Sequence, residues 1–137
     1  MPPTRRTFNL VLCGAAVELA ACGSSLRTVA PAGNQVSLSY AEFPALANAG
    51  GSAVVAVAGS FPLAVVRVDD TTAVALSATC THQGCALEYD AGREQLHCPC
   101  HGADFDLSGA VLDGPTIIPL PVYAASAGPD AVVVDLR

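Results

Sequence analysis

Lysine and tryptophan are missing from this chain, and aromatic side chains of every kind are scarce. The 137 residues include only 5% aromatics and a single methionine, and the six basic residues are all arginines. Twelve Asp and Glu residues outnumber them, so the formal net charge is -6 at pH 7. A nucleic-acid-binding domain needs clustered positive charge to neutralise phosphates. The composition therefore predicts that nucleic acid is not a partner.

The chain also lacks an apolar run long enough to cross a membrane as a helix. The run from Leu10 to Ala21 is interrupted by Glu18 and is far shorter than the roughly 20 residues that a spanning helix needs. It follows Thr4-Arg5-Arg6-Thr7-Phe8, which resembles a twin-arginine export signal. It ends in Leu19-Ala20-Ala21-Cys22, which resembles a bacterial lipobox.

These features predict that residues 1–21 are an export signal peptide and that Cys22 is a lipidation site. The mature protein is then expected in the periplasm or on an extracytoplasmic membrane face, held by a lipid anchor at Cys22. Two alternatives stay open because of Glu18: an uncleaved short anchor, or an ordinary signal that ends at Cys22. Residues 22–34 are small and polar, which indicates a flexible tether ahead of one domain over residues 35–137.

The domain shows short β-favouring runs separated by turns. Apolar residues alternate over residues 36–40, and further runs cover 53–58, 63–68, 73–77, 87–89, 94–98, 103–107, 117–124 and 131–135. Pro119 and Pro121 are expected to confine the segment 117–124 to a sheet edge. The pattern predicts an all-β fold, either an antiparallel β-sandwich or a small barrel.

Four of the six cysteines and two of the three histidines lie in two short boxes, C-T-H-Q-G-C at residues 80–85 and C-P-C-H-G at residues 98–102. Each box offers one chelating pair, Cys80 with His82 and Cys98 with His101. Two thiolates and two imidazoles suit a mixed-ligand [2Fe-2S] centre, with sulfur on one iron and neutral nitrogen on the other. The same residue types also suit a tetrahedral structural zinc site, so zinc stays open as an alternative.

Each box has one further cysteine, Cys85 in the first and Cys100 in the second. This spare pair could bridge the two loops as a disulfide. The third histidine, His97, directly precedes Cys98 in a predicted strand, so we expect an exposed or half-buried strand residue rather than a ligand.

The two boxes resemble those of Rieske iron-sulfur proteins, in the branch that carries a disulfide between its cluster-binding loops, as in cytochrome bc-type complexes. The likeness continues through Phe105-Asp106, Ser108-Gly109 and Gly114-Pro115, and it spans roughly residues 74–121. The resemblance implies one [2Fe-2S] cluster per chain, ligated by Cys80, His82, Cys98 and His101, and a disulfide between Cys85 and Cys100.

The resemblance also implies a Rieske-type antiparallel β-sandwich with a small two-loop cluster-binding subdomain at about residues 78–115. Gly114 and Pro115 look like the family's proline loop, which covers the cluster. In the family's high-potential members a Ser and a Tyr donate hydrogen bonds to cluster sulfurs, whereas Ala103 and Phe105 occupy those positions here. The loss of two donors predicts a lowered redox potential.

The resemblance implies one-electron transfer with redox donor and acceptor proteins, and not a self-sufficient catalyst. Gln83 stands where quinol-oxidising subunits typically carry Leu, which argues against ordinary quinol oxidation. The alternative is a subunit of a larger oxidoreductase, either a cytochrome bc-type complex or a complex like arsenite oxidase. The acidic surface is compatible with a basic redox partner, although a merely solvated surface is the simpler explanation.

Overall fold

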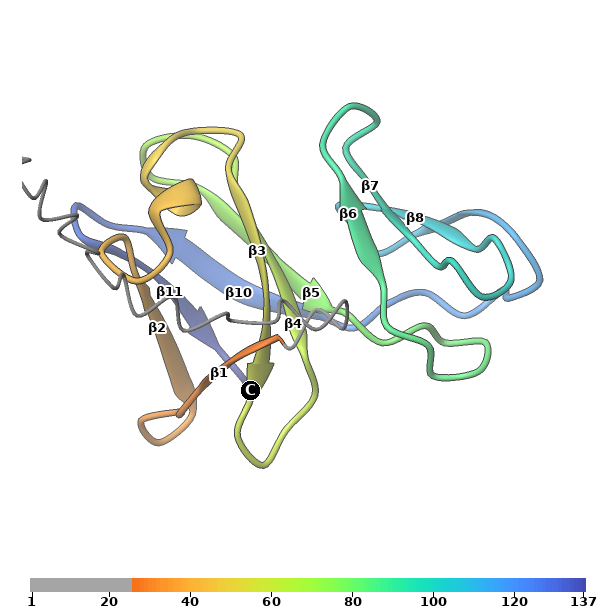
Figure 1. Cartoon of the computed structure of the whole chain (residues 1–137), viewed down its shortest axis with the longest axis horizontal. Helices are drawn as coiled ribbons and strands as arrows, with labels where there is room; N and C mark the ends of the chain where they lie inside the picture. The colour runs from red at the N-terminus through yellow and green to blue at the C-terminus, as the bar shows by residue number, and fades with distance from the viewer. Residues whose placement is uncertain (1–25) are drawn as a thin grey trace, which may run out of the picture.

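A computed structural model gives the fold of residues 26–137 (Figure 1). The expected signal peptide and Cys22 lie outside the described residues, so the expectations about them stay predictions. Within residues 26–137, no helix combines the length and the apolar character that crossing a membrane requires.

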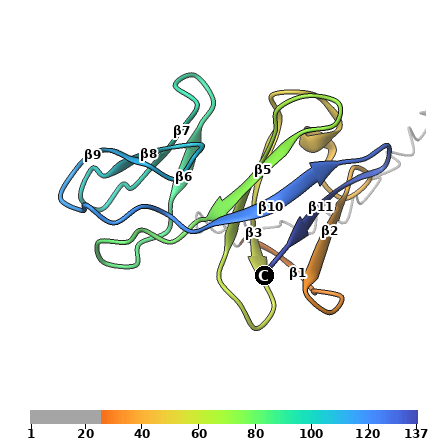
Figure 2. The ribbon, with the colours of Figure 1, turned by 180° about the vertical axis from the view of Figure 1, so that it is seen from behind.

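Two β-sheets make up almost all of the regular structure, which confirms the all-β prediction (Figures 1 and 2). The larger sheet has the order β1-β3-β4-β5-β10-β11-β2 and contains β1 (Arg27–Val29), β2 (Gln35–Ser39), β3 (Ser52–Val57), β4 (Leu63–Arg67), β5 (Ala73–Ser77), β10 (Val122–Ala127) and β11 (Ala131–Asp135). The smaller sheet has the order β6-β7-β8-β9 and contains β6 (Glu88–Asp90), β7 (Gln95–His97), β8 (Asp104–Asp106) and β9 (Val111–Asp113). One short 3-10 helix, Pro44–Ala47, lies between β2 and β3.

The larger sheet curls around a core of aliphatic side chains. Alternation along β2 and β11 follows the predicted pattern, because every second residue is fully buried and its neighbours are not. The inward residues are mainly valine and leucine: Val36, Leu38, Leu46, Val55, Leu63, Val65, Val132 and Val134. This barrel-like sandwich is the base on which the smaller sheet rests.

Strands β4 and β5 connect the two parts because both of their faces are covered. Leu63 and Val65 of β4 point into the core of the larger sheet, whereas Ala64 belongs to a second core. Leu96 and Phe105 from the smaller sheet pack into that second core and are fully buried there. The smaller sheet is thereby docked on the outer face of β4 and β5, which fixes the position of the two boxes.

Two expectations about the chain are wrong in detail. The expected tether over residues 22–34 includes β1, which pairs in parallel with β3, so this part of it belongs to the larger sheet. The segment 117–124 does not form an edge, because β10 lies between β5 and β11. Pro119 and Pro121 precede the first residue of β10, so neither removes a donor from the ladder, and the Pro121 carbonyl accepts from Ser77 N–H at 2.9 Å.

Candidate metal centre

The two boxes form loops of the same backbone design. In the first loop the N–H of Gly84 donates to the carbonyl of Cys80 at 2.9 Å, and in the second the N–H of Gly102 donates to the carbonyl of Cys98 at 2.9 Å. Both glycines have positive φ, 73° and 77°, which a side chain would disfavour. The repeated cysteine-to-glycine turn explains why each box needs its glycine four residues after the first cysteine.

The sulfur atoms of Cys80 and Cys98 form the buried half of the centre. Both residues are almost completely buried, at 2% and 0% exposure, and both belong to the second core. Burial raises the pKa of the Cys80 thiol, and the backbone N–H of His82, directed at the sulfur, opposes this effect. A pair of buried thiols with N–H groups aimed at one of them is an environment that suits metal-bound thiolates.

The two imidazoles form the exposed half. His82 and His101 are both exposed, and their ring centroids lie 4.8 Å apart with the ring planes at 83°. Since residues 82 and 101 come from different loops, only the tertiary structure could place these rings beside each other. The donor set is therefore two buried sulfurs and two imidazoles at the surface, which fits a [2Fe-2S] cluster with two cysteine and two histidine ligands.

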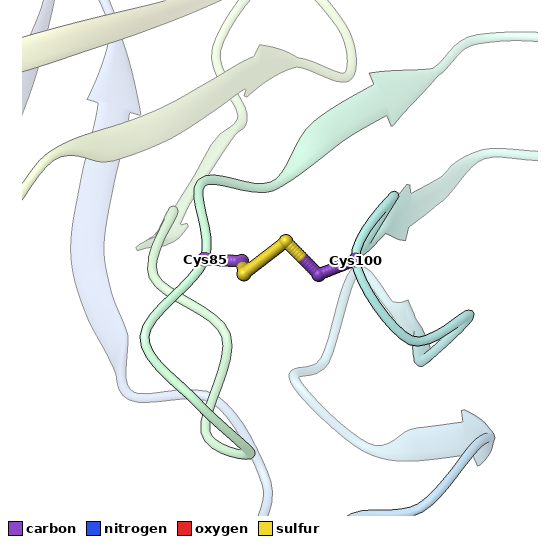
Figure 3. The surroundings of a disulfide bond; sticks show 2 residues. All are labelled: Cys85 and Cys100. Carbon is purple, nitrogen blue, oxygen red and sulfur yellow. A yellow bond between two sulfur atoms is a disulfide. The ribbon is translucent and has the colours of Figure 1, made fainter.

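A disulfide between Cys85 and Cys100 ties the two loops together (Figure 3). The Sγ atoms of Cys85, Cys98 and Cys100 lie within 4.8 Å of one another. Two of these sulfurs are bonded to each other and are not available as thiolates, which leaves Cys98 free for a metal. Among the described residues the free cysteines are Cys80 and Cys98, so the pairing that the resemblance implied is confirmed.

A third segment, residues 114–118, is fastened to the first loop by hydroxyl groups. The Thr81 hydroxyl donates to the carbonyl of Ile118 at 2.7 Å and lies 3.0 Å from the Thr116 hydroxyl. Thr116 is buried, and its oxygen also accepts from the N–H of Ile118 at 3.1 Å. Sequence analysis missed this link, because neither threonine carries a signal beyond its position beside a recognised motif.

The same third segment reaches the second loop through Gly114, which packs directly on the backbone of Ala103. Ala103 and Phe105 are both fully buried beside the second loop. Because neither side chain has a hydroxyl group, neither can donate a hydrogen bond to the centre. Pro115 is exposed, and Gln83 is exposed at the tip of the first loop. The structure thus gathers all the predicted tuning positions around the two loops.

A sequence profile of the Rieske [2Fe-2S] domain matches residues 40–124, which is more than half of the chain. The chain belongs to the Rieske [2Fe-2S] family. Its members bind a [2Fe-2S] cluster, and the donor set described above fits that group. This membership favours an iron-sulfur cluster over a structural zinc ion at the site.

Curated relatives are Rieske subunits of larger complexes. The cytochrome b6-f complex iron-sulfur subunit of Chlorobaculum thiosulfatiphilum is 40% identical over 60 residues, which are 44% of this chain and 33% of the relative. The subunit of the same description from Prochlorococcus marinus (strain MIT 9301) is 38% identical over 72 residues, 53% of this chain and 40% of the relative. The chain thus matches only about a third of the length of these relatives.

Solved structures of similar fold cover more of the chain. The plasma membrane Rieske protein of the cyanobacterium Synechocystis PCC 6803 superposes with a TM-score of 0.57 at 31% identity, over 71% of this chain and 94% of that one. A chain from the complex of oxygenase and ferredoxin in carbazole 1,9a-dioxygenase superposes with a TM-score of 0.60 at 27% identity. The superposition covers 76% of this chain and 94% of that one. The fold is therefore that of small Rieske proteins as well as of Rieske subunits.

Proposed function

We propose that this Rieske protein is an exported one-electron carrier of lowered redox potential that exchanges electrons through the edge bearing His82 and His101. The observation that carries the proposal is the pair of exposed imidazoles, 4.8 Å apart, in a centre whose two free thiols are buried. An electron partner can approach this centre only from the imidazole side, because the sulfur side lies inside the second core.

Each residue of the centre has a distinct role in this proposal. Cys80 and Cys98 would hold one iron of the cluster, and His82 and His101 would hold the other. The cluster, when bound, supplies a carrier of one electron. The Cys85 to Cys100 disulfide keeps the two loops from separating, and the Thr81 hydroxyl keeps the third segment against them. The protein is thus a preorganised scaffold that changes little when the electron arrives.

The lowered potential follows from Ala103 and Phe105. A hydroxyl that donates to a cluster sulfur stabilises the additional electron, and the side chains at these two buried positions have no donor. We therefore place the midpoint in the lower part of the range of about -150 to +300 mV that Rieske centres cover. A midpoint near the upper end of this range would contradict the proposal.

The edge around the imidazoles has no charged side chain among its three segments, residues 78–87, 99–103 and 114–121. Ile117 and Ile118 are 92% and 57% exposed, and Ile118 is held beside the first loop by Thr81. Of the twelve Asp and Glu residues that give the protein its charge, Glu18 precedes the described residues and the others lie outside these three segments. We therefore expect a partner to dock through apolar and neutral polar contacts, and electron transfer to depend only weakly on ionic strength.

Export and lipid anchoring complete the proposal, and both rest on the sequence of residues 1–22. Arg5 and Arg6 support twin-arginine export, and Cys22 supports lipidation. Cell fractionation of a Cys22→Ser variant tests the anchor. If Cys22 is lipidated, the variant should leave the membrane fraction while its cluster stays intact. Mass spectrometry of the mature N-terminus tests whether cleavage occurs before Cys22.

A second candidate function is that of an electron-transfer subunit of a larger oxidoreductase. The names of the relatives favour a cytochrome b6-f type of complex. We place the free-standing carrier first because Gln83, exposed at the tip of the first loop, stands where quinol-oxidising subunits typically carry Leu. Co-purification with a larger catalytic chain at stoichiometric yield would reverse this order.

Electron paramagnetic resonance during a redox titration is the decisive experiment. The reduced protein should show the rhombic signal of a two-histidine [2Fe-2S] cluster, with two iron and two sulfide per chain expected from such a cluster. A Cys80→Ser variant should lose the signal, whereas a Ser60→Ala variant, at an exposed position in the turn between β3 and β4, should keep it. Protein that contains zinc and gives no signal would overturn the electron-transfer proposal.

A further inference from the structure

The side chains of His97 and Asp104 form a short cross-strand hydrogen bond that neither family membership nor the proposed function explains. The Nδ1–H of His97 donates to Oδ1 of Asp104 over 2.6 Å. The Asp104 side chain is only 15% exposed and that of His97 is 40% exposed, so the bond is partly shielded from water. A charge-assisted hydrogen bond that is partly desolvated is stronger than an exposed one.

This pair lies at the root of the second loop. His97 is the last residue of β7, Asp104 is the first residue of β8, and the two are directly opposite in the antiparallel register. The next pair along the ladder is Cys98 with Ala103, joined by the Cys98 N–H to Ala103 carbonyl bond at 2.8 Å. The second loop, residues 98–103, therefore begins and ends directly beside this side-chain pair.

The pair and the ligand occupy opposite faces of the same two strands. Side chains alternate along β7 and β8, so Leu96, Cys98 and Phe105 point into the second core while His97 and Asp104 point outward. The hydrogen bond thus lies on the strand face opposite the Cys98 side chain and does not contact the cluster site. It can set the separation and twist of the two strands that carry Cys98 and Ala103.

Asp104 also reaches the third segment. It is the register partner of Asp113, and the β8–β9 ladder shifts between Asp104 and Phe105. The Asp113 carboxylate accepts from the N–H of Gly114 at 2.8 Å, and Gly114 is the residue that packs on Ala103. A strand displaced at Asp104 would therefore move both the second loop and the segment that covers it.

We infer that His97 and Asp104 are positioning residues for the cluster, which hold Cys98 and the second loop in register through their cross-strand hydrogen bond. The inference rests on the proposed function, because it concerns the site that would hold the cluster. Arg93 is not essential to this positioning, since its guanidinium lies 4.0 Å from the second carboxylate oxygen of Asp104 and is itself largely exposed.

Variants at His97 test this inference on the cluster-loaded protein. His97→Phe keeps a planar ring and removes the donor, whereas His97→Asn retains a short side chain with an N–H that can donate to Asp104. We expect His97→Phe to lose its cluster about tenfold faster than wild type, which corresponds to about 1.4 kcal/mol. The same variant should broaden or shift the electron paramagnetic resonance lines and move the midpoint. His97→Asn should restore much of each property.

Two controls separate positioning from ordinary stability. Arg93→Ala removes only the longer contact to Asp104, and Arg137→Ala removes a 2.6 Å surface ion pair with Asp135 that is distant from the loops in sequence. Both should keep the spectrum and the midpoint of wild type. If Asp104→Ala does not fold, the comparison of His97→Phe with His97→Asn still decides the question.

The outcomes are distinguishable from a failure of the proposed function. A wild-type protein without a cluster signal would refute the proposed function itself, before any variant is made. A His97→Phe variant with unchanged lines, midpoint and cluster lifetime would overturn the positioning role, even if its melting temperature fell. An effect of Arg93→Ala as large as that of His97→Phe would also overturn it, because charge near the loop rather than the hydrogen bond would then be responsible.

Discussion

Gly114 and Ala103 are in closer contact than any side chain at position 114 would permit. A Cβ built on Gly114 would lie 2.5 Å from Ala103 Cα and 3.0 Å from both its Cβ and its backbone nitrogen. Gly114 also has a φ of 110°, a conformation that residues with side chains rarely adopt. The third segment can therefore lie on the second loop only if residue 114 is glycine.

Replacement of Gly114 by alanine should displace this segment and shorten the lifetime of the cluster. The cost has two parts, a backbone penalty of about 1–2 kcal/mol and a clash with backbone atoms that have no room to move. Gly59→Ala is the matched control, because Gly59 has a φ of 73° with nothing within 4 Å of the added Cβ. Thermal unfolding and cluster loss followed by visible absorbance should both show a larger effect at Gly114. Equal effects at the two glycines would mean that the contact with Ala103 is unimportant.

Hydroxyl groups introduced at the two tuning positions should raise the midpoint potential. Ala103→Ser and Phe105→Tyr each add a donor at a fully buried position beside the second loop. A net hydrogen bond of about 0.5–1.5 kcal/mol to the reduced form corresponds to roughly 20–60 mV for a one-electron couple. Ala124→Ser, at an exposed position in β10, is the control and should leave the potential unchanged. Redox titration checks the three values, and no rise in either tuning variant would refute the explanation of the lowered potential.

Removal of the Thr81 hydroxyl should loosen the third segment from the first loop. Thr81→Val keeps the shape of the side chain but deletes the donor to Ile118 and the contact with Thr116. The contact with Thr116 is partly buried and the bond to Ile118 is exposed, so we expect a loss of about 0.5–1.5 kcal/mol in the free energy of unfolding. Hydrogen exchange should show the N–H of Ile118 becoming less protected. Thr28→Val in the exposed strand β1 provides the comparison, and it should change neither measurement.

The stability of the smaller sheet should fall with acid through Asp106. The Ser108 hydroxyl, followed by the N–H groups of Ala110 and Ser108, lowers the pKa of this carboxyl below its usual value. A carboxyl whose pKa is lower in the folded than in the unfolded state stabilises the protein above the unfolded pKa of about 3.9. This contribution is lost as the pH falls from about 4 through the lowered pKa.

Asp106→Asn tests this sign, because the amide oxygen can accept the same hydrogen bonds but does not titrate. Urea unfolding should find the wild type more stable than the variant at pH 6, and the difference should shrink as the pH approaches 3. A difference that stays constant over this range would show that Asp106 acts by shape alone.

The local sequence determined the secondary structure and the chemical identity of the centre. Alternation of apolar residues predicted which residues of β2 are buried. The spacing of cysteine, histidine and glycine in the two boxes predicted both loops, because these features depend on residues close together in the chain. The family's Cys85 to Cys100 pairing also followed from the boxes, once the resemblance was recognised. The place of Pro119 and Pro121 was misjudged, because a proline excludes only its own position from a ladder and not the residues after it.

Tertiary structure alone decided the contacts between segments distant in sequence. Thr81 contacts Ile118 across 37 positions and Gly114 contacts Ala103, and no local sequence pattern predicts either contact. The His97 to Asp104 bond depends on how β7 and β8 align, and a shift of one residue would turn His97 toward the core. The sequence thus determined which ligands the chain offers, whereas the docking of the smaller sheet on β4 and β5 decided how they are held. The reason is that the type of ligand atom is set by each residue alone, whereas the relative positions of the ligands depend on how the side chains of both cores pack together.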